Sequence, residues 1–213
     1  EFPAKLVALL QTFADQAVIA IQNARLFNET QEALARQTGT ADMLRVISNS
    51  PTDVQPVFDT IVVTAVKLLA CDSAFMLRCD GKTFSPAAVA TPAGLAADLG
   101  PSNVPVDPSV NFPSRAIVEK KMLHLPDWSV IDLPEHERNV HNVYGVNSAL
   151  FLPLLRDDEC VGVLALASTR ANAFSAKDIA LAKSFRDQAM IAIENVRLFN
   201  ETKEALEQQT ATS

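Results

Sequence analysis

One stretch of this sequence occurs twice, once near each end of the chain. Residues 2–40 and 174–212 align without a gap at an offset of 172, and about 25 of the 39 aligned positions are identical. Repetition of this length at a fixed offset indicates a chain built from similar units. The helix that closes one unit also opens the next. We therefore expect residues 1–29 to be the tail of a preceding unit and residues 200–213 to lead into a following one.

Both copies of the repeat are predicted to be helical. In the second copy, apolar residues recur at helical spacing and no Gly or Pro follows Ala176. Ser175 is a suitable N-cap, and the Asp178 carboxylate stands where it can reach back to the cap. After Arg197 the sequence becomes polar, so this part of the helix is expected to leave the globular body.

The polar part of the first copy carries a weak heptad pattern. Phe27, Leu34 and Ala41 are seven residues apart, and Leu44 follows three residues later. A single exposed helix of this length is marginally stable in water, whereas two such helices bury the apolar seam between them. We expect a parallel homodimer through the terminal helices, with a solvated single helix as the alternative.

The segment between the two copies alternates helical and strand patterns. A break at 49–53 precedes a predicted helix over 54–69, and shorter helices are expected near 93–99 and over 113–121. Residues 126–146 are expected to be a polar excursion. Strands are predicted at 73–80, 82–91, 122–125, 148–155 and 160–167.

This order predicts an α+β domain with one antiparallel sheet, helices packed on one face, and long N- and C-terminal helices. The expected boundaries are a signalling or coiled-coil linker helix at 1–50, the domain at 51–197 and the start of the next linker helix at 198–213.

Three segments of the domain together resemble the GAF family. They read Ser-Ala-Leu-Phe-Leu-Pro-Leu at 148–154, Val-Gly-Val-Leu-Ala-Leu at 161–166 and Phe-Ser-Ala-Lys-Asp-Ile at 174–179. The resemblance covers about residues 53–195. It implies a six-stranded, profilin-like antiparallel sheet with a ligand pocket on the face away from the terminal helices. It also implies a cytoplasmic part of a bacterial sensor, such as a histidine kinase of a two-component system or a nucleotide cyclase.

Strand parity and the implied topology bring eight side chains toward this pocket. They are Phe75, Leu77, Phe112, Ser114, His124, Trp128, Tyr144 and Leu152. The alternative is that several of them only fill the core. The free N–H groups expected at the helix start near 111–114 also make a small anion conceivable there.

Single residues argue against the best-known ligands of the resembled family. Ile179 replaces the Glu that cyclic-nucleotide binding requires after Asp178, and no Asn-Lys pair occurs. Glu135 replaces the Cys that would attach a bilin covalently. No cofactor is therefore expected.

The three histidines give no stronger case for a metal or haem. His124 lies in a predicted strand and is expected to be structural, whereas His136 and His141 lie in a polar segment and are expected to be exposed. A metal site built from His136, Glu137 and His141 is not expected.

Charge, hydropathy and cysteine spacing argue against nucleic-acid binding, membrane contact and a disulfide framework. The net charge of −7, without a basic cluster, argues against nucleic acid. No apolar stretch reaches the roughly 20 residues of a membrane span, so no membrane contact is expected. Cys71, Cys79 and Cys160 are widely spaced and are expected to be reduced thiols of a cytoplasmic protein.

We therefore predict a non-catalytic sensory domain that binds an unknown small molecule or relays a conformational signal through a helical dimer. No phosphate loop, nucleophile elbow or paired carboxylate motif is present. One alternative is a ligand-free dimerisation and spacer domain. A less favoured one is an enzyme of the free-methionine sulfoxide reductase type, because Cys160 is expected to lie far from Cys71 and Cys79.

Overall fold

The computed structural model describes residues 3–50 and 52–211 of the chain. The chain divides into two compact units, Glu1–Ala41 and Asp42–Ser213. Within the described residues, no helix combines the length and the apolar character that crossing a membrane requires.

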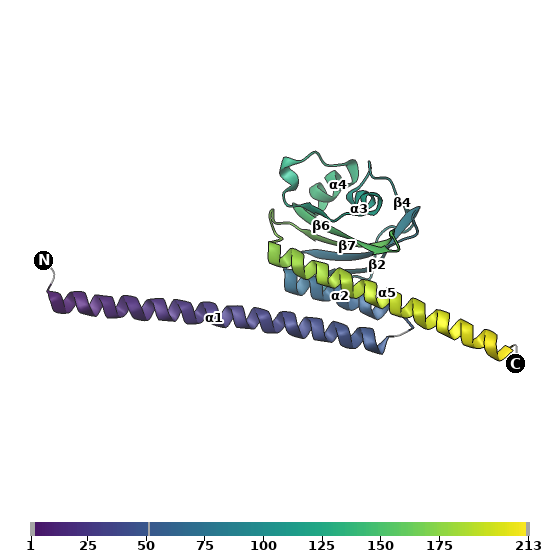
Figure 1. Cartoon of the computed structure of the whole chain (residues 1–213). Helices are drawn as coiled ribbons and strands as arrows, with labels where there is room; N and C mark the ends of the chain where they lie inside the picture. The colour runs from purple at the N-terminus through teal and green to yellow at the C-terminus, as the bar shows by residue number, and fades with distance from the viewer. Residues whose placement is uncertain (1–2, 51, 212–213) are drawn as a thin grey trace. The chain divides into compact units, whose positions relative to one another are not determined.

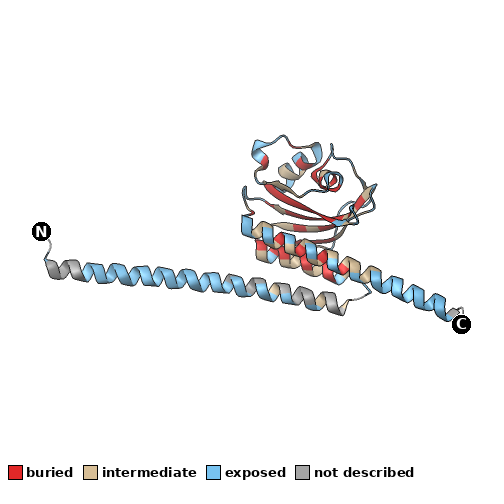
Figure 2. Cartoon of the chain, in the orientation of Figure 1, coloured by how far each residue is buried: buried red, intermediate tan, exposed pale blue. Residues whose placement is uncertain are grey.

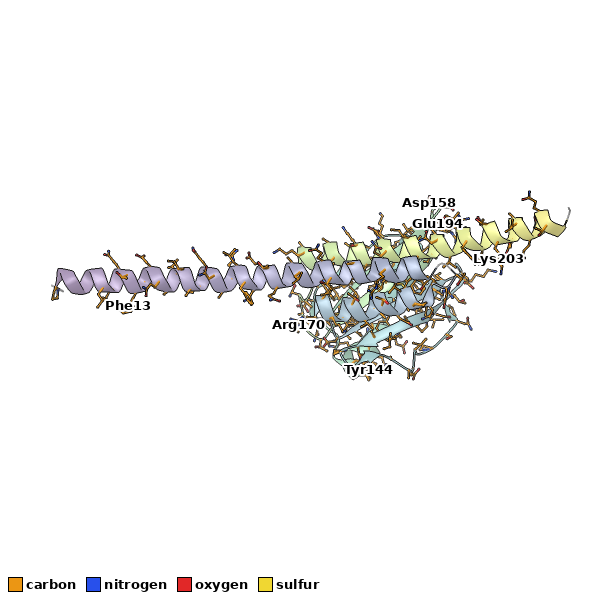
Figure 3. All side chains as sticks on the ribbon, turned by 90° about the horizontal axis from the view of Figure 1, so that it is seen from below. Phe13, Tyr144, Asp158, Arg170, Glu194 and Lys203 are labelled. Carbon is orange, nitrogen blue, oxygen red and sulfur yellow. The ribbon has the colours of Figure 1, made fainter. Side chains whose placement is uncertain are left out.

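The first unit consists of part of one long helix, α1 (Ala4–Asn49). This helix confirms the helical reading of the first repeat, and it ends before Pro51. Large apolar side chains along it are exposed, and Phe13 projects from the helix with 58% of its surface accessible (Figure 3). The others are Leu9, Leu10, Val18, Ile19, Ile21, Leu26, Phe27 and Leu34. The expected helical dimer would cover such a run of exposed apolar side chains.

Besides the end of α1, the second unit contains a seven-stranded antiparallel sheet and four further α-helices among its described residues. The strands are β1 (Ser73–Cys79), β2 (Thr83–Thr91), β3 (Gly94–Leu95), β4 (Val104–Pro105), β5 (Leu123–Leu125), β6 (Ser148–Arg156) and β7 (Glu159–Ser168). Their order is β3-β2-β1-β7-β6-β5, and β4 pairs with β2. The helices are α2 (Gln55–Leu69), α3 (Phe112–Glu119), α4 (Glu135–Tyr144) and α5 (Ala176–Ala211), with a short 3-10 helix at Trp128–Val130.

The helices cover both faces of the sheet (Figure 1). Helices α2 and α5 pack on one face, as the sequence predicts, and α3 and α4 lie over the other. We call the layer under α2 and α5 the inner core; it is centred on Phe58, Met76, Leu152, Leu164 and Phe185. We call the layer under α3 and α4 the outer core. Figure 2 shows buried residues in both layers.

Two local predictions differ from the structure. Residues 93–99 form no helix, because Gly94 adopts a φ of 114° and turns the chain so that Gly94–Leu95 pairs with β2. The polar excursion at 126–146 contains α4, which begins after Pro134 and ends at Gly145 in a left-handed conformation. Pro134 and Gly145 are local start and stop signals of a helix. The segment between them has few apolar residues, so no apolar periodicity indicated the helix.

Helix α5 begins with the predicted capping box. The Asp178 amide donates to the Ser175 hydroxyl at 3.3 Å, and the Ser175 amide donates to the Asp178 carboxylate at 2.9 Å. From there the helix runs 36 residues without interruption. Its first half is part of the inner core, and residues 198–210 are exposed (Figure 2).

Gly162 permits the close pairing of β1 with β7. A Cβ atom at this position would overlap the backbone carbonyl of Leu77 on the neighbouring strand. The glycine of the Val-Gly-Val-Leu segment is therefore required by the sheet itself.

Candidate functional site

The outer core is built around Phe112, the first residue of α3. Its ring lies 5.7 Å from Trp128 and 6.1 Å from Phe151, centroid to centroid, and the Arg115 guanidinium lies 5.2 Å from its centroid. The other members of the layer are Leu77, Phe84, Ala116, Ile117, Leu133, Val146, Ala149, Cys160, Val163 and Ala165.

A carboxylate is buried in this apolar layer. Glu137 of α4 is only 2% exposed, and its Oε1 accepts the backbone N–H of Phe112 at 2.6 Å. Its Oε2 is buried and has no hydrogen-bond partner among the described residues. Burial raises the pKa of Glu137 to about 7, although the Phe112 N–H and the charge of Arg115 oppose this rise. The group therefore changes its charge close to neutral pH.

The first turn of α3 is held by side chains of this chain. Asn111 Oδ1 accepts the Ser114 N–H at 2.8 Å, and Glu137 accepts the Phe112 N–H. Ser114 Oγ accepts the Asp107 N–H at 3.0 Å. The position at which the sequence made a small anion conceivable is thus occupied by the chain's own carboxylate.

A second polar atom of the outer core also lacks a partner. The indole Nε1 of Trp128 is buried without a hydrogen bond to any described residue, while its backbone N–H donates to Asn147 at 2.8 Å. The layer therefore contains an unpaired acceptor, Glu137 Oε2, and an unpaired donor, Trp128 Nε1. Buried polar atoms without partners are energetically costly, so these two atoms are the unsatisfied polar groups of the layer.

Five of the eight side chains predicted to share one face do so. Phe75, Leu77, Phe112 and Trp128 pack in or against the outer core, and Ser114 is buried on α3 beside them.

The other three do not. Leu152 belongs to the inner core, and His124 pairs across the sheet with the inner-core residue Leu150, so both face the opposite way. Tyr144, at the end of α4, is 69% exposed and points outward (Figure 3). The parity prediction fails on β6 because both of its faces are apolar.

The histidines and Glu137 do not converge. His136 is exposed, Glu137 points into the outer core, and the His141 Nδ1–H donates to the Val146 carbonyl at 2.8 Å. Over the described ranges, no three His, Cys, Asp or Glu side chains form a group able to hold a metal ion. The sequence noted Glu137 only as a weak metal ligand; its position in the first turn of a helix after Pro134 was the one available signal.

The cysteines are arranged differently from the prediction. Cys160 is not remote from Cys79: both lie on the outer-core side, at neighbouring ends of β7 and β1, close enough for the Cys79 charge to raise the pKa of Cys160. Burial is the main cause that raises the pKa of both thiols. Cys71 belongs to the inner core, and burial raises its pKa to about 12. Protonated thiols are poor nucleophiles.

Comparison with known proteins connects this architecture to one family. The model of the GAF domain matches residues 53–193. No curated protein sequence matches the chain.

Several solved structures share the fold. The GAF domain of an Acinetobacter phosphoenolpyruvate-protein phosphotransferase is 15% identical, with a TM-score of 0.60 over 78% of this chain and 97% of its own. Residues 122 to 287 of a methyl-accepting chemotaxis protein are 20% identical, with a TM-score of 0.58 over 76% and 98%. Free methionine-R-sulfoxide reductase from Neisseria meningitidis, in complex with its substrate, is 14% identical, with a TM-score of 0.62 over 79% and 93%.

Proposed function

Because the chain belongs to the GAF domain family, we propose that it is a sensory and regulatory domain without catalysis of its own. The observation that carries this proposal is the continuity of α5. Ala182, Phe185 and Ala189 are fully buried in the inner core, and the same helix continues past Leu198 in solvent. A rearrangement of the sheet therefore acts on a rigid element that leaves the domain.

The sensing site of this proposal is the outer core. Glu137 Oε2 offers an acceptor and Trp128 Nε1 offers a donor, and both atoms are buried in a layer that contains the Phe112–Trp128 ring contact. We expect a small molecule with an N–H donor for the carboxylate and an acceptor for the indole. A ligand shifts the domain between two states only if it binds them with different affinity, and a donor to Oε2 would favour the state in which Oε1 keeps its bond to Phe112 and the carboxylate is charged.

The output of this proposal is a parallel homodimer. Phe27 is 64% and Leu34 57% exposed on α1, and Leu198 and Leu206 are exposed on α5. Ala41 is also exposed, and the side chain of Leu44 lies outside the described residues. Pairing of two copies would bury these side chains and stabilise the helices. We further propose that the unit belongs to a cytoplasmic bacterial signalling protein with tandem units and a kinase or cyclase output.

A reductase of the kind found in Neisseria is the second candidate, favoured by the proximity of Cys79 and Cys160. The raised pKa of both thiols weakens it. Incubation with free methionine sulfoxide and a dithiol reductant tests it. If the wild-type chain reduces methionine sulfoxide and Cys79→Ser does not, this activity is established and the non-catalytic assignment is overturned.

The single tryptophan makes the leading proposal testable, because Trp128 lies inside the candidate site. Small amines, amides and guanidines are titrated while Trp128 emission is recorded. Each compound that shifts the emission is then tested on chains spin-labelled at Leu206→Cys, with the three native cysteines replaced by serine. We expect the distance between labels on two protomers to change. An unchanged distance with every bound compound would favour the ligand-free dimerisation and spacer role.

A further inference from the structure

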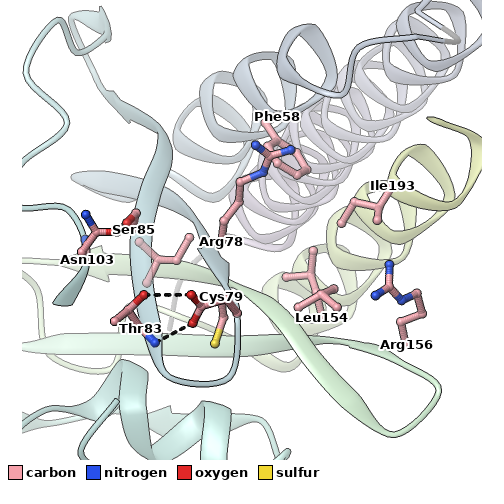
Figure 4. Close-up of a pocket in the computed structure, with 12 residues that line it drawn as sticks. Phe58, Arg78, Cys79, Thr83, Ser85, Asn103, Leu154, Arg156 and Ile193 are labelled. Carbon is pink, nitrogen blue, oxygen red and sulfur yellow. Dashed lines mark hydrogen bonds between the residues drawn. The ribbon is translucent and has the colours of Figure 1, made fainter. Parts of the chain in front are cut away.

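A hollow opens at one end of the sheet, mainly on the side of the inner core, and its rim reaches Leu77 and Cys79 of the outer-core side. It has a volume of about 470 Å³ and opens between α2, α5 and the ends of β1, β2, β6 and β7. Phe58, Leu154, Val161 and Ile193 form its apolar wall. Arg78 and Arg156 stand on either side of Leu154 and Ile193 (Figure 4).

Among the described residues both arginines lack an ion pair, although the Glu194 carboxylate lies near Arg156. The Arg78 guanidinium lies 5.9 Å from the centroid of the Phe58 ring. Within residues 3–50 and 52–211, the side chains of Arg78 and Arg156 have no ion pair and no hydrogen bond. An acidic chain of net charge −7 thus places two unpaired cations beside one apolar wall.

Two carboxylates, Asp80 in the lining of the hollow and Glu194 near Arg156, already accept hydrogen bonds within the chain. Asp80 accepts the backbone N–H groups of Lys82 at 2.9 Å and Thr83 at 2.7 Å, which fixes the turn between β1 and β2. Glu194 is held by Arg197 through two hydrogen bonds. Arg156 is close enough to help lower the pKa of Glu194, but Arg197 is the larger cause. An incoming anion therefore does not have to displace an existing partner of either arginine.

These features define a ligand class. Guanidinium groups form forked, charge-assisted hydrogen bonds with carboxylates and phosphates. Hollows of about 300–1,000 Å³ with apolar walls and a few polar groups are typical of small-molecule sites. We propose that this hollow binds an amphiphilic anion: a carboxylate or phosphate monoester held between Arg78 and Arg156, with its apolar chain or ring on Leu154, Val161 and Ile193.

The position of the hollow gives its occupant direct access to the output helix. Ile193 belongs to α5 just before the helix becomes exposed, and Phe58 belongs to α2. A bound molecule would therefore contact α5 without passing through the outer core. The hollow contains neither Glu137 nor Trp128, the two polar residues of the sensing site proposed above.

Calorimetric titration of the full chain tests the proposal with four probes of equal chain length. Decanoate and decyl phosphate carry the required charge, decanol carries none, and decyltrimethylammonium carries the opposite charge. We expect one or both anions to bind, and the stronger one identifies the head group. Arg78→Gln and Arg156→Gln should each weaken binding about tenfold, and the double variant about a hundredfold.

The control is Arg138→Gln with Arg186→Gln, which removes the same charge from arginines outside the hollow. It should bind like wild type. Methyl NMR of the full chain should show anion-dependent shifts at Leu154, Val161 and Ile193 rather than at Ile117 and Leu133. The proposal is overturned if neither anion binds, if decanol binds as tightly, if the control loses as much affinity as the double variant, or if the shifts map to the outer core.

Discussion

The Glu137 carboxylate accepts the backbone N–H of Phe112 at 2.6 Å, across 25 positions of sequence. One bond thereby joins α4 to the first residue of α3 inside an apolar layer. Because the carboxylate is buried, its protonation state is linked to the stability of the fold.

The pH dependence of stability should reveal this carboxylate. Its pKa in the folded chain is about 7, above the ordinary value of 4.5, so folding favours the protonated form. The contribution of Glu137 to the free energy of unfolding is fully present below pH 4.5, and it is lost as the pH rises from 4.5 through 7. The loss is on the order of 3 kcal/mol. Glu137→Gln keeps an acceptor for Phe112 and should remove this loss.

Urea unfolding between pH 4.5 and 8, followed by Trp128 emission, measures the effect. We expect Glu137→Gln and wild type to converge at the acidic end and the variant to be more stable at pH 8. Glu135→Gln, an exposed change on the same helix, should behave like wild type. Wild-type and Glu137→Gln curves that stay parallel across this range would contradict the prediction.

Gly162→Ala should damage the sheet. The added methyl group meets the Leu77 carbonyl, a backbone atom that cannot move without disturbing the pairing of β1 and β7. We expect a loss of about 3 kcal/mol or more in unfolding free energy. Gly145→Ala, where the nearest atom is 3.8 Å away and only the positive φ is unfavourable, should cost about 1–2 kcal/mol. Equal losses in the two variants would show that the close approach is unimportant.

The proposed dimer predicts that charged residues on the apolar face of α1 lower the mass of the protein in solution. Phe27→Glu combined with Leu34→Glu places charge at the predicted seam of α1 and should convert a dimer to a monomer in sedimentation equilibrium. Asn28→Glu with Gln31→Glu adds the same charge at polar positions of the same helix and should leave the dimer intact. A wild-type chain that sediments as a monomer at micromolar concentration would refute the proposal.

Ser175→Ala should loosen the start of α5. The substitution removes the hydroxyl that accepts the Asp178 N–H and should cost about 1 kcal/mol. Amide hydrogen exchange should accelerate in the first turn of α5 and remain unchanged past Phe185. Ser184→Ala, within the same helix, serves as the control, and matching exchange in both variants would count against the capping role.

Elements that are determined by residues close together in the sequence could be predicted from the sequence alone. The capping box at Ser175 and Asp178 and the hairpin of β6 and β7 follow from short-range patterns, and both are confirmed. The face of each strand was harder to predict. Leu150 to Leu154 are apolar on both faces, and ladder irregularities follow Leu154 and Met76, so alternation does not reveal which side chains share a layer.

The candidate site was predicted only in part, for a different reason. Phe112 and Trp128 were expected in it from strand parity and the topology that the family resemblance implies. Glu137 was not, because a glutamate is normally exposed unless a partner accompanies it into the core. That partner is a backbone N–H from another helix, which no local pattern around Glu137 announces.

The uninterrupted course of α5 also makes it a lever arm. Its fulcrum lies near Ala192, the last fully enclosed position, and the chain continues to Ala211. With a rise of 1.5 Å per residue, a tilt of about 5° at the fulcrum swings the far end by roughly 2–3 Å. That displacement is comparable with the small helix shifts that switch other signalling assemblies. A rearrangement too small to disturb the packing of the sheet would thus be magnified at the exposed end of the helix, where the proposed dimer would detect it.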